Sequence, residues 1–161
     1  MREGQAFRSA RRAREFEAFV AGAGGRLLHA ATLLTAEPPD DPPRARKLLT
    51  AALARTYASW DRLRGEDPYD CARTELAVRF ARGSWHQHRG HGGALAHVPP
   101  QERLVLVLRL FEGVGEEQVA ALLGLPVERV RALHARAVTL AAGTPGDSAP
   151  AAPSPGGTAS V

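Results

Sequence analysis

The stretch from Pro99 to Leu140 constrains the fold of this chain more than any other. Two prolines open it, and the dense apolar residues from Leu104 to Phe111 then predict a helix that ends near Gly113. A second helix is expected after two glutamates, which suit the positive end of a helix dipole. The apolar residues of this second helix also recur at helical spacing, and Gly124 follows it at once. A tight turn that needs a positive φ is therefore expected at Gly124.

After this turn, Pro126 pre-sets the backbone for a third helix. The apolar residues of this helix recur at steps of three and four and predict one buried face: Val127, Val130, Leu133, Ala137 and Leu140. A short helix, a glycine turn and a second helix make a helix-turn-helix, whose DNA-binding form places the second helix in the major groove. The residues expected to face outward are Glu128, Arg129, Arg131, Ala132, Ala135 and Arg136. A helical hairpin that only packs remains the alternative, because the charge of the segment is balanced.

Three further helices are expected upstream, over residues 15–34, 44–60 and 68–85. Glycines at 22, 24 and 25 weaken or kink the first, and the string TAEPPDDPP marks an exposed, stiff connection to the second. The sequence therefore predicts an all-α protein with two small helical domains, residues 15–89 and residues 99–142. A short linker rich in glycine and histidine, residues 90–98, joins them.

Both ends of the chain differ in composition from these domains. Residues 1–14 form a basic N-terminal tail that we expect to be loosely ordered at its start. Residues 143–161 are rich in proline, glycine, serine and alanine, and they cannot bury enough apolar surface to offset the entropy of ordering. A disordered C-terminal tail is therefore expected.

The net charge of +4 permits a nucleic-acid partner but does not require one. Cys71 is the single cysteine, so an intramolecular disulfide is impossible, and we interpret this residue as a small buried side chain. The N-terminus lacks the apolar core of a signal peptide, and no apolar run reaches the length of a membrane helix. We expect a cytoplasmic protein that does not enter a membrane.

Four histidines near the linker raise the question of a metal site: His86, His88, His91 and His97. Imidazole suits zinc and related ions, but the intervening glycines impose no rigid spacing and no carboxylate in the segment orients the rings. We expect no metal site and no cofactor. The chain also lacks a nucleophile elbow and a phosphate-binding loop, so no enzymatic activity is expected.

Three strings occur in an order that resembles one protein family: EFEAFVAGAGGRLLHAATLLT, LLTAALARTYASWDRLRGEDP and LVLVLRLFEGVGEEQVAALLGLPVERVRALHARA. They are similar to the extracytoplasmic-function (ECF) sigma factors of RNA polymerase, particularly to the actinobacterial members. The resemblance implies that the first domain, region 2, binds the polymerase clamp and melts the promoter −10 element. It also implies that the second domain, region 4, reads the −35 element through its helix-turn-helix.

The resemblance assigns DNA-binding residues in both domains. In region 4 they are Arg129, Arg131, Ala132, Ala135 and Arg136, and in region 2 they are Arg73, Arg79, Arg82, Trp85 and Arg89. Arginine and aromatic side chains suit such a role because they stack on unpaired bases. Trp85 as a buried core residue remains the alternative. Pro126 stands where the family usually has a serine cap, which removes a side-chain cap worth about 1 kcal/mol.

The expected partners are core RNA polymerase, promoter DNA and, by the same resemblance, an anti-sigma factor. Contact with the core polymerase falls on Lys47, Thr50 and Ala51, where the family carries an acid, a glutamine and an acid. A lysine in place of an acid reverses the charge presented to a basic partner surface, which can cost several kcal/mol.

The expected linker is also short for this family. From Arg89 to Pro99 the chain reaches at most about 33–36 Å, whereas the −35 and −10 elements lie about 50–60 Å apart, more than one and a half helical turns of DNA. Two functions follow from this pattern. The first is a DNA-binding initiation factor that directs core polymerase to promoters. The alternative is a degenerate sigma-like interaction protein that binds a regulator or polymerase without directing initiation.

Overall fold

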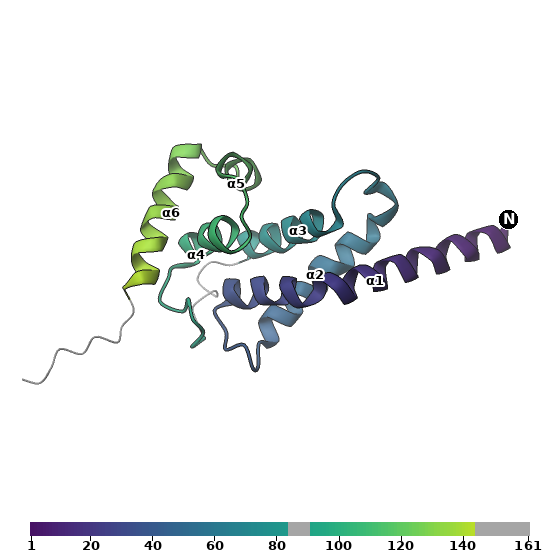
Figure 1. Ribbon diagram of the computed structural model, residues 1–161, viewed down its shortest axis with the longest axis horizontal. Coiled ribbons are helices and arrows are strands. Elements are labelled where there is room, and N and C mark those ends of the chain that lie inside the picture. The colour runs from purple at the N-terminus through teal and green to yellow at the C-terminus, as the bar shows by residue number, and fades with distance from the viewer. Residues whose placement is uncertain (84–90, 144–161) are drawn as a thin grey trace, which may run out of the picture.

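The computed structural model describes residues 1–83 and 91–143, and in these residues every regular element is helical (Figure 1). This confirms the all-α prediction. The N-terminal half holds the helices α1, α2 and α3 with one short turn of 3₁₀ helix, and the C-terminal half holds α4, η3, α5 and α6. The elements in chain order are α1 (Arg2–Thr35), α2 (Pro43–Ala58), η1 (Trp60–Arg62), α3 (Pro68–Arg82), α4 (Pro100–Leu106), η3 (Val107–Phe111), α5 (Glu116–Leu123) and α6 (Val127–Ala142).

Helix α1 begins at Arg2 and continues without a break to Thr35, so the expectation of a loosely ordered start is wrong. Alanine, arginine and glutamate favour helix throughout this segment. Arg12 also ties the segment to the bundle, because its guanidinium donates to the carbonyl of Tyr57 and pairs with Asp61 at 3.3 Å. Beyond this contact the first residues of α1 project from the rest of the molecule (Figure 1).

Helices α1, α2 and α3 pack against one another as a bundle. The apolar positions of α1 switch from exposed to buried along the helix, and from Leu27 onward most of them lie in the core. An aromatic cluster closes the other end of the bundle and consists of Phe16, Phe19, Tyr57 and Trp60. In this cluster the rings of Phe16 and Trp60 meet edge to face at 5.3 Å, a favourable arrangement for aromatic pairs.

The expected exposed connection between α1 and α2 contains a buried acid, Glu37. Its carboxylate accepts hydrogen bonds from the backbone N–H groups of Arg44 at 3.0 Å and Ala45 at 2.7 Å. These donors belong to the first turn of α2, where no helical carbonyl is available to them. Glu37 therefore caps α2 from outside the helix.

The C-terminal half contains the predicted helix-turn-helix. Gly124 ends α5 with a φ of 64°, as the turn requires, and α6 starts three residues later. The preceding apolar helix differs from the prediction, because after Leu106 it widens into the π-helical turn η3. Leu110 and Phe111, the last two residues of this turn, are exposed.

Residues 91–98, most of the expected linker, dock against the C-terminal end of α1. The N–H groups of His91 and Gly93 both donate to the carbonyl of Ala36, at 2.8 and 2.9 Å. A side chain at Gly93 would meet the carbonyl oxygen of Glu37 at 2.4 Å, so only glycine fits there. Leu95 and Val98 are buried, and one hydrophobic core extends through both halves.

Candidate nucleic-acid interface

The second helix of the helix-turn-helix, α6, presents a polar and arginine-rich face to solvent. Val130, Leu133 and Ala137 are buried, because they repeat at steps of three and four residues and so fall on one side of the helix. All six residues expected to face outward are exposed: Glu128, Arg129, Arg131, Ala132, Ala135 and Arg136. The structure therefore leaves this face of α6 exposed to solvent.

Two arginines of this face form ion pairs within the C-terminal half. The Nε atom of Arg131 lies 2.7 Å from a carboxylate oxygen of Glu116, and the Nε atom of Arg136 lies 3.4 Å from one of Glu102. Both guanidinium groups stay largely exposed, at 61% and 67% of the side-chain surface. Among the described residues Arg129 has no ion-pair partner. Arg129 is therefore ready to contact an anion, whereas Arg131 must exchange Glu116 for its ligand.

The start of α6 has the backbone of a capped helix without the side-chain cap. Pro126 occupies the N-cap position in an extended conformation and makes no side-chain hydrogen bond.

His134 lies further along α6 and is half-buried. Its pKa is lowered, first by burial and then by the charge of Arg109, while the charge of Glu116 acts in the opposite direction. His134 is therefore neutral at pH 7 and adds no positive charge to the face.

In the N-terminal half, the predicted DNA-contacting residues do not share one surface. Arg79 and Arg82 are exposed near the end of α3, on adjacent turns of one face. Arg73 lies on another side of the helix and is largely buried, with only 16% of its side chain exposed. Trp85 and Arg89 lie outside the described residues.

The residues predicted to contact the core polymerase lie on α2 beside some of these arginines. Lys47 and Thr50 are exposed, and Ala51 is half-buried. Lys47 and Ala51 line a cavity of about 430 Å³ together with Arg44, Leu48, Arg79, Phe80, His91 and Thr35. The charged side chains of this cavity are all basic, a charge that complements a phosphate backbone better than a basic protein surface.

A buried carboxylate that the sequence did not indicate joins the two halves. Glu112 follows η3, and only 4% of its side chain is exposed. The hydroxyl of Tyr69 donates to both of its carboxylate oxygens, at 2.8 and 3.0 Å. Arg26 from α1 lies 3.3 Å away and Arg73 from α3 lies 3.8 Å away. Sequence patterns do not reveal this network, because its members come from three elements that are distant in the chain.

The ring of Tyr69 lies close to both arginines of this network. The guanidinium carbon of Arg26 is 4.6 Å from the ring centroid and that of Arg73 is 5.8 Å from it. Burial, followed by the hydrogen bond to Glu112, raises the pKa of the Tyr69 hydroxyl above its ordinary value. The hydroxyl therefore stays protonated and acts as a donor to the carboxylate.

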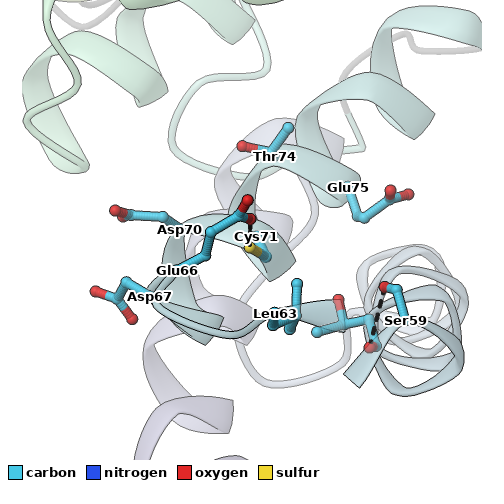
Figure 2. A pocket seen from close by; sticks show the side chains of 9 residues that line it. Ser59, Leu63, Glu66, Asp67, Asp70, Cys71, Thr74 and Glu75 are labelled. Atoms are coloured by element: carbon cyan, nitrogen blue, oxygen red, sulfur yellow. Dashed lines mark hydrogen bonds between the residues drawn. The ribbon is translucent and has the colours of Figure 1, made fainter. Parts of the chain in front are cut away.

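A second cavity, of about 520 Å³, is acidic and lies between the end of α2 and the start of α3 (Figure 2). Glu66, Asp67, Asp70 and Glu75 line it around Cys71. Burial, followed by a hydrogen bond to Glu66 at 3.2 Å, raises the pKa of Cys71 to about 11. The expectation of a small buried side chain at Cys71 is wrong, because this residue is half-buried and lines the cavity. The acidic charge makes this side of the molecule unsuitable for DNA.

Of the four histidines weighed as metal ligands, His86 and His88 lie outside the described residues. His91 lines the basic cavity, and the Nε2 atom of His97 lies 3.0 Å from the carbonyl oxygen of Leu140. In residues 1–83 and 91–143, histidine, cysteine and acidic side chains do not gather in a group of three or more suited to a metal ion.

Comparisons with known proteins bear on both halves. Residues 94–139 match the family model of sigma-70, region 4, so the match begins within the expected linker and ends inside α6. The chain is also 27% identical, over 149 residues, to the RNA polymerase sigma-E factor of Streptomyces coelicolor (strain ATCC BAA-471 / A3(2) / M145). That alignment covers 77% of this chain and 82% of the relative. These findings confirm the resemblance to the ECF-type sigma factors. Among the described helices, none is both long and apolar enough to cross a membrane.

Proposed function

We propose that this sigma-like chain directs core RNA polymerase to promoters, with the C-terminal half at the −35 element and the N-terminal half at the −10 element. The observation that carries the proposal is the coincidence of two results. The segment similar to sigma-70 region 4 contains the helix-turn-helix, and the second helix of that motif exposes every residue expected to face DNA. A cytoplasmic location belongs to the same proposal, since polymerase and promoters are found there.

At the −35 element, α6 enters the major groove with its N-terminal turns toward the bases. Arg129 and Arg131 then reach base edges, where arginine pairs best with guanine O6 and N7. The small side chains of Ala132 and Ala135 let the helix approach closely and contact thymine methyl groups. Arg136, one turn further along, contacts the phosphate backbone and sets the position of the helix.

At the −10 element, Arg79 and Arg82 supply positive charge beside the basic cavity between α2 and α3. Trp85 and Arg89, which follow in sequence, complete the set that we propose for the unpaired strand. Arginines track the backbone of a single strand, and an aromatic ring stacks on a base for about 1–3 kcal/mol.

Docking to core polymerase is assigned to the exposed side of α2 around Lys47, Thr50 and Ala51. The altered charge at Lys47 supports a second candidate function, a sigma-like protein that binds a regulator such as an anti-sigma factor, or polymerase, without directing initiation. The two candidates differ in a measurable property, because only the first requires productive binding to core polymerase.

The deciding experiment titrates full-length protein, labelled at its N-terminus, with core RNA polymerase at low and moderate salt. If the protein directs initiation, we expect it to bind core polymerase saturably with a Kd below about 1 µM. The complex should then transcribe genomic fragments in a promoter-dependent manner. Absence of binding by folded protein would overturn the proposal in favour of the second candidate.

A triple variant adds a test of the docking surface on α2. Lys47→Asp, Thr50→Gln and Ala51→Glu together restore the acid, glutamine and acid of the family. If α2 is the docking surface, this variant gains affinity for core polymerase, whereas the matched control Arg55→Asp, an exposed charge reversal on the same helix, does not. Equal affinity for all three proteins would place the docking surface elsewhere.

A further inference from the structure

The network around Glu112 has the composition of a site for an anionic polymer. Arg26 and Arg73 provide two guanidinium groups, and Tyr69 provides a hydroxyl donor and an aromatic ring close to both. Guanidinium groups form their strongest hydrogen bonds with carboxylate and phosphate oxygens. An aromatic ring beside such groups is the arrangement that holds single-stranded nucleic acid, with phosphates on the cations and a base on the ring.

The anion in this site belongs to the other half of the same molecule. Glu112 lies between η3 and Gly113, whose φ of 66° turns the chain sharply there. Its carboxylate accepts from Tyr69 and pairs with Arg26, so it takes the place that a phosphate group would occupy. It also lies 3.8 Å from Arg73, whose nearer partner is Asp70 at 2.8 Å. Because only 4% of its side chain is exposed, no external anion can enter while Glu112 stays in place.

The contact between the halves contains other charged groups. Arg103 of α4 is fully buried with its guanidinium 6.0 Å from the ring of Phe80 in α3, and burial lowers its pKa to about 10. Taking such charges out of water costs free energy that their partners largely offset rather than exceed. Polar contacts of this kind are typical of domain interfaces that open and close.

We propose that Arg26, Tyr69 and Arg73 form a binding site for the backbone of single-stranded DNA, and that Glu112 occupies it in the free protein. The choice of DNA as ligand rests on the proposed function, whereas the occupancy by Glu112 does not. Arg73 was expected to contact DNA, but Arg26 and Tyr69 were not. Separation of the halves removes Glu112 and opens the site, so DNA binding and opening of the molecule are coupled.

The test uses the full chain and the variant Glu112→Gln, which keeps the size of the side chain and removes its charge. The probe is a fluorescein-labelled single-stranded oligonucleotide of mixed sequence, followed by fluorescence anisotropy. If Glu112 leaves the site free in only about one molecule in ten, its release raises the apparent affinity about tenfold. The radius of gyration from small-angle X-ray scattering is expected to increase at the same time.

Matched variants separate this effect from a change in net charge. Glu17→Gln removes one exposed negative charge from α1 and is expected to bind the oligonucleotide as the unmodified protein does. Adding Arg26→Ala or Tyr69→Phe to Glu112→Gln is expected to abolish most of the gain. Glu112→Asp, which keeps the charge and shortens the side chain by one methylene so that it withdraws from Tyr69, serves as a milder release if Glu112→Gln fails to fold.

Two results would overturn the inference. A folded Glu112→Gln protein with unchanged affinity for the oligonucleotide shows that the cluster is not a nucleic-acid site. A gain of affinity for core polymerase alone shows that the ligand is a protein surface. The oligonucleotide result is independent of promoter recognition, because that assay contains no polymerase. Failure of the wild-type protein to bind polymerase therefore leaves the oligonucleotide result unaffected.

Discussion

At the scale of single residues, Glu37 shows how a side chain from a connection sets the start of a helix. Its carboxylate accepts from the N–H groups of Arg44 and Ala45, and it is itself buried with 4% exposure. A negative charge at this position also suits the positive end of the α2 dipole. The segment TAEPPDDPP has the composition of an exposed connection, yet this one residue is part of the folded structure.

We expect Glu37→Ala to lower the free energy of unfolding by about 1–2 kcal/mol, because two N–H groups in the first turn of α2 lose their acceptor. Urea unfolding followed by circular dichroism measures the change. Glu17→Ala, which alters an exposed position in α1, is the control and should change stability by less than about 0.5 kcal/mol. Equal stabilities of the two variants would contradict the capping role.

His134 predicts a dependence of stability on pH. Its pKa in the folded protein is lowered below its ordinary value of about 6.5. Below that pH the unfolded chain binds a proton more readily than the folded one, so this residue destabilises the fold progressively as the pH falls. We expect the melting temperature to drop less between pH 7 and pH 5 in His134→Gln than in the unmodified protein. An identical drop in both would assign the effect to other groups.

At the scale of elements, the N-terminal and later turns of α6 have different proposed roles in DNA binding. In the proposed function the arginines of the N-terminal turns contact base edges, whereas Arg136, more than one turn further along, contacts phosphate. Ion pairs with Glu116 and Glu102 hold two of these side chains in place before DNA arrives. The outward face of α6 is therefore ordered in the free protein, but two of its positive charges are partly neutralised by these carboxylates.

We expect Arg131→Ala to reduce binding to a cognate −35 duplex by about 1–3 kcal/mol and to relax base preference at one position. Arg136→Ala should weaken binding to all duplexes alike and reduce the dependence on salt concentration, because it removes a phosphate contact. Binding to a panel of single-base variants in complex with polymerase distinguishes the two. If both substitutions weaken every duplex equally, Arg131 contacts phosphate rather than a base.

At the scale of the whole molecule, the packed halves must separate for the proposed function. The described residues place both halves on one core, whereas the two promoter elements lie about 50–60 Å apart. Helix α3 ends at Arg82, earlier than expected, and α4 begins at Pro100. The chain between these residues reaches at most about 59–65 Å when fully extended. Release of residues 91–98 from α1 would give the halves enough reach for both elements, and we expect it to accompany promoter binding.

Gly93→Ala tests whether this docked segment holds the halves together. Its Cβ would lie 2.4 Å from the carbonyl oxygen of Glu37 and 2.6 Å from the carbonyl carbon of Ala36, so the segment must shift away from α1. We expect faster amide hydrogen exchange at His91 and at position 93, whose N–H groups donate to Ala36. Gly25→Ala, where a Cβ meets nothing within 4 Å, is the control. Unchanged exchange would show that the segment accommodates a side chain.

Much of the C-terminal half could be predicted from the sequence, because its determinants are local. Steps of three and four apolar residues place Val130, Leu133 and Ala137 on one side of α6, and no distant contact alters that geometry. The turn at Gly124 is equally local, since a positive φ depends on one residue. The outward face of α6, and with it half of the candidate site, follows from these two facts.

The network around Glu112 and the surroundings of several predicted site residues depend on tertiary structure alone. Glu112 stands 43 positions from Tyr69 and 86 from Arg26, so only the packing of the halves brings them together. That packing also brings Arg73 within 3.8 Å of Glu112 and leaves Leu110 and Phe111, at the end of η3, exposed. Periodicity tells which side of a helix is apolar. The partner of a charged group depends on which elements meet, because a buried charge takes its counter-charge from whatever part of the chain is nearest in space.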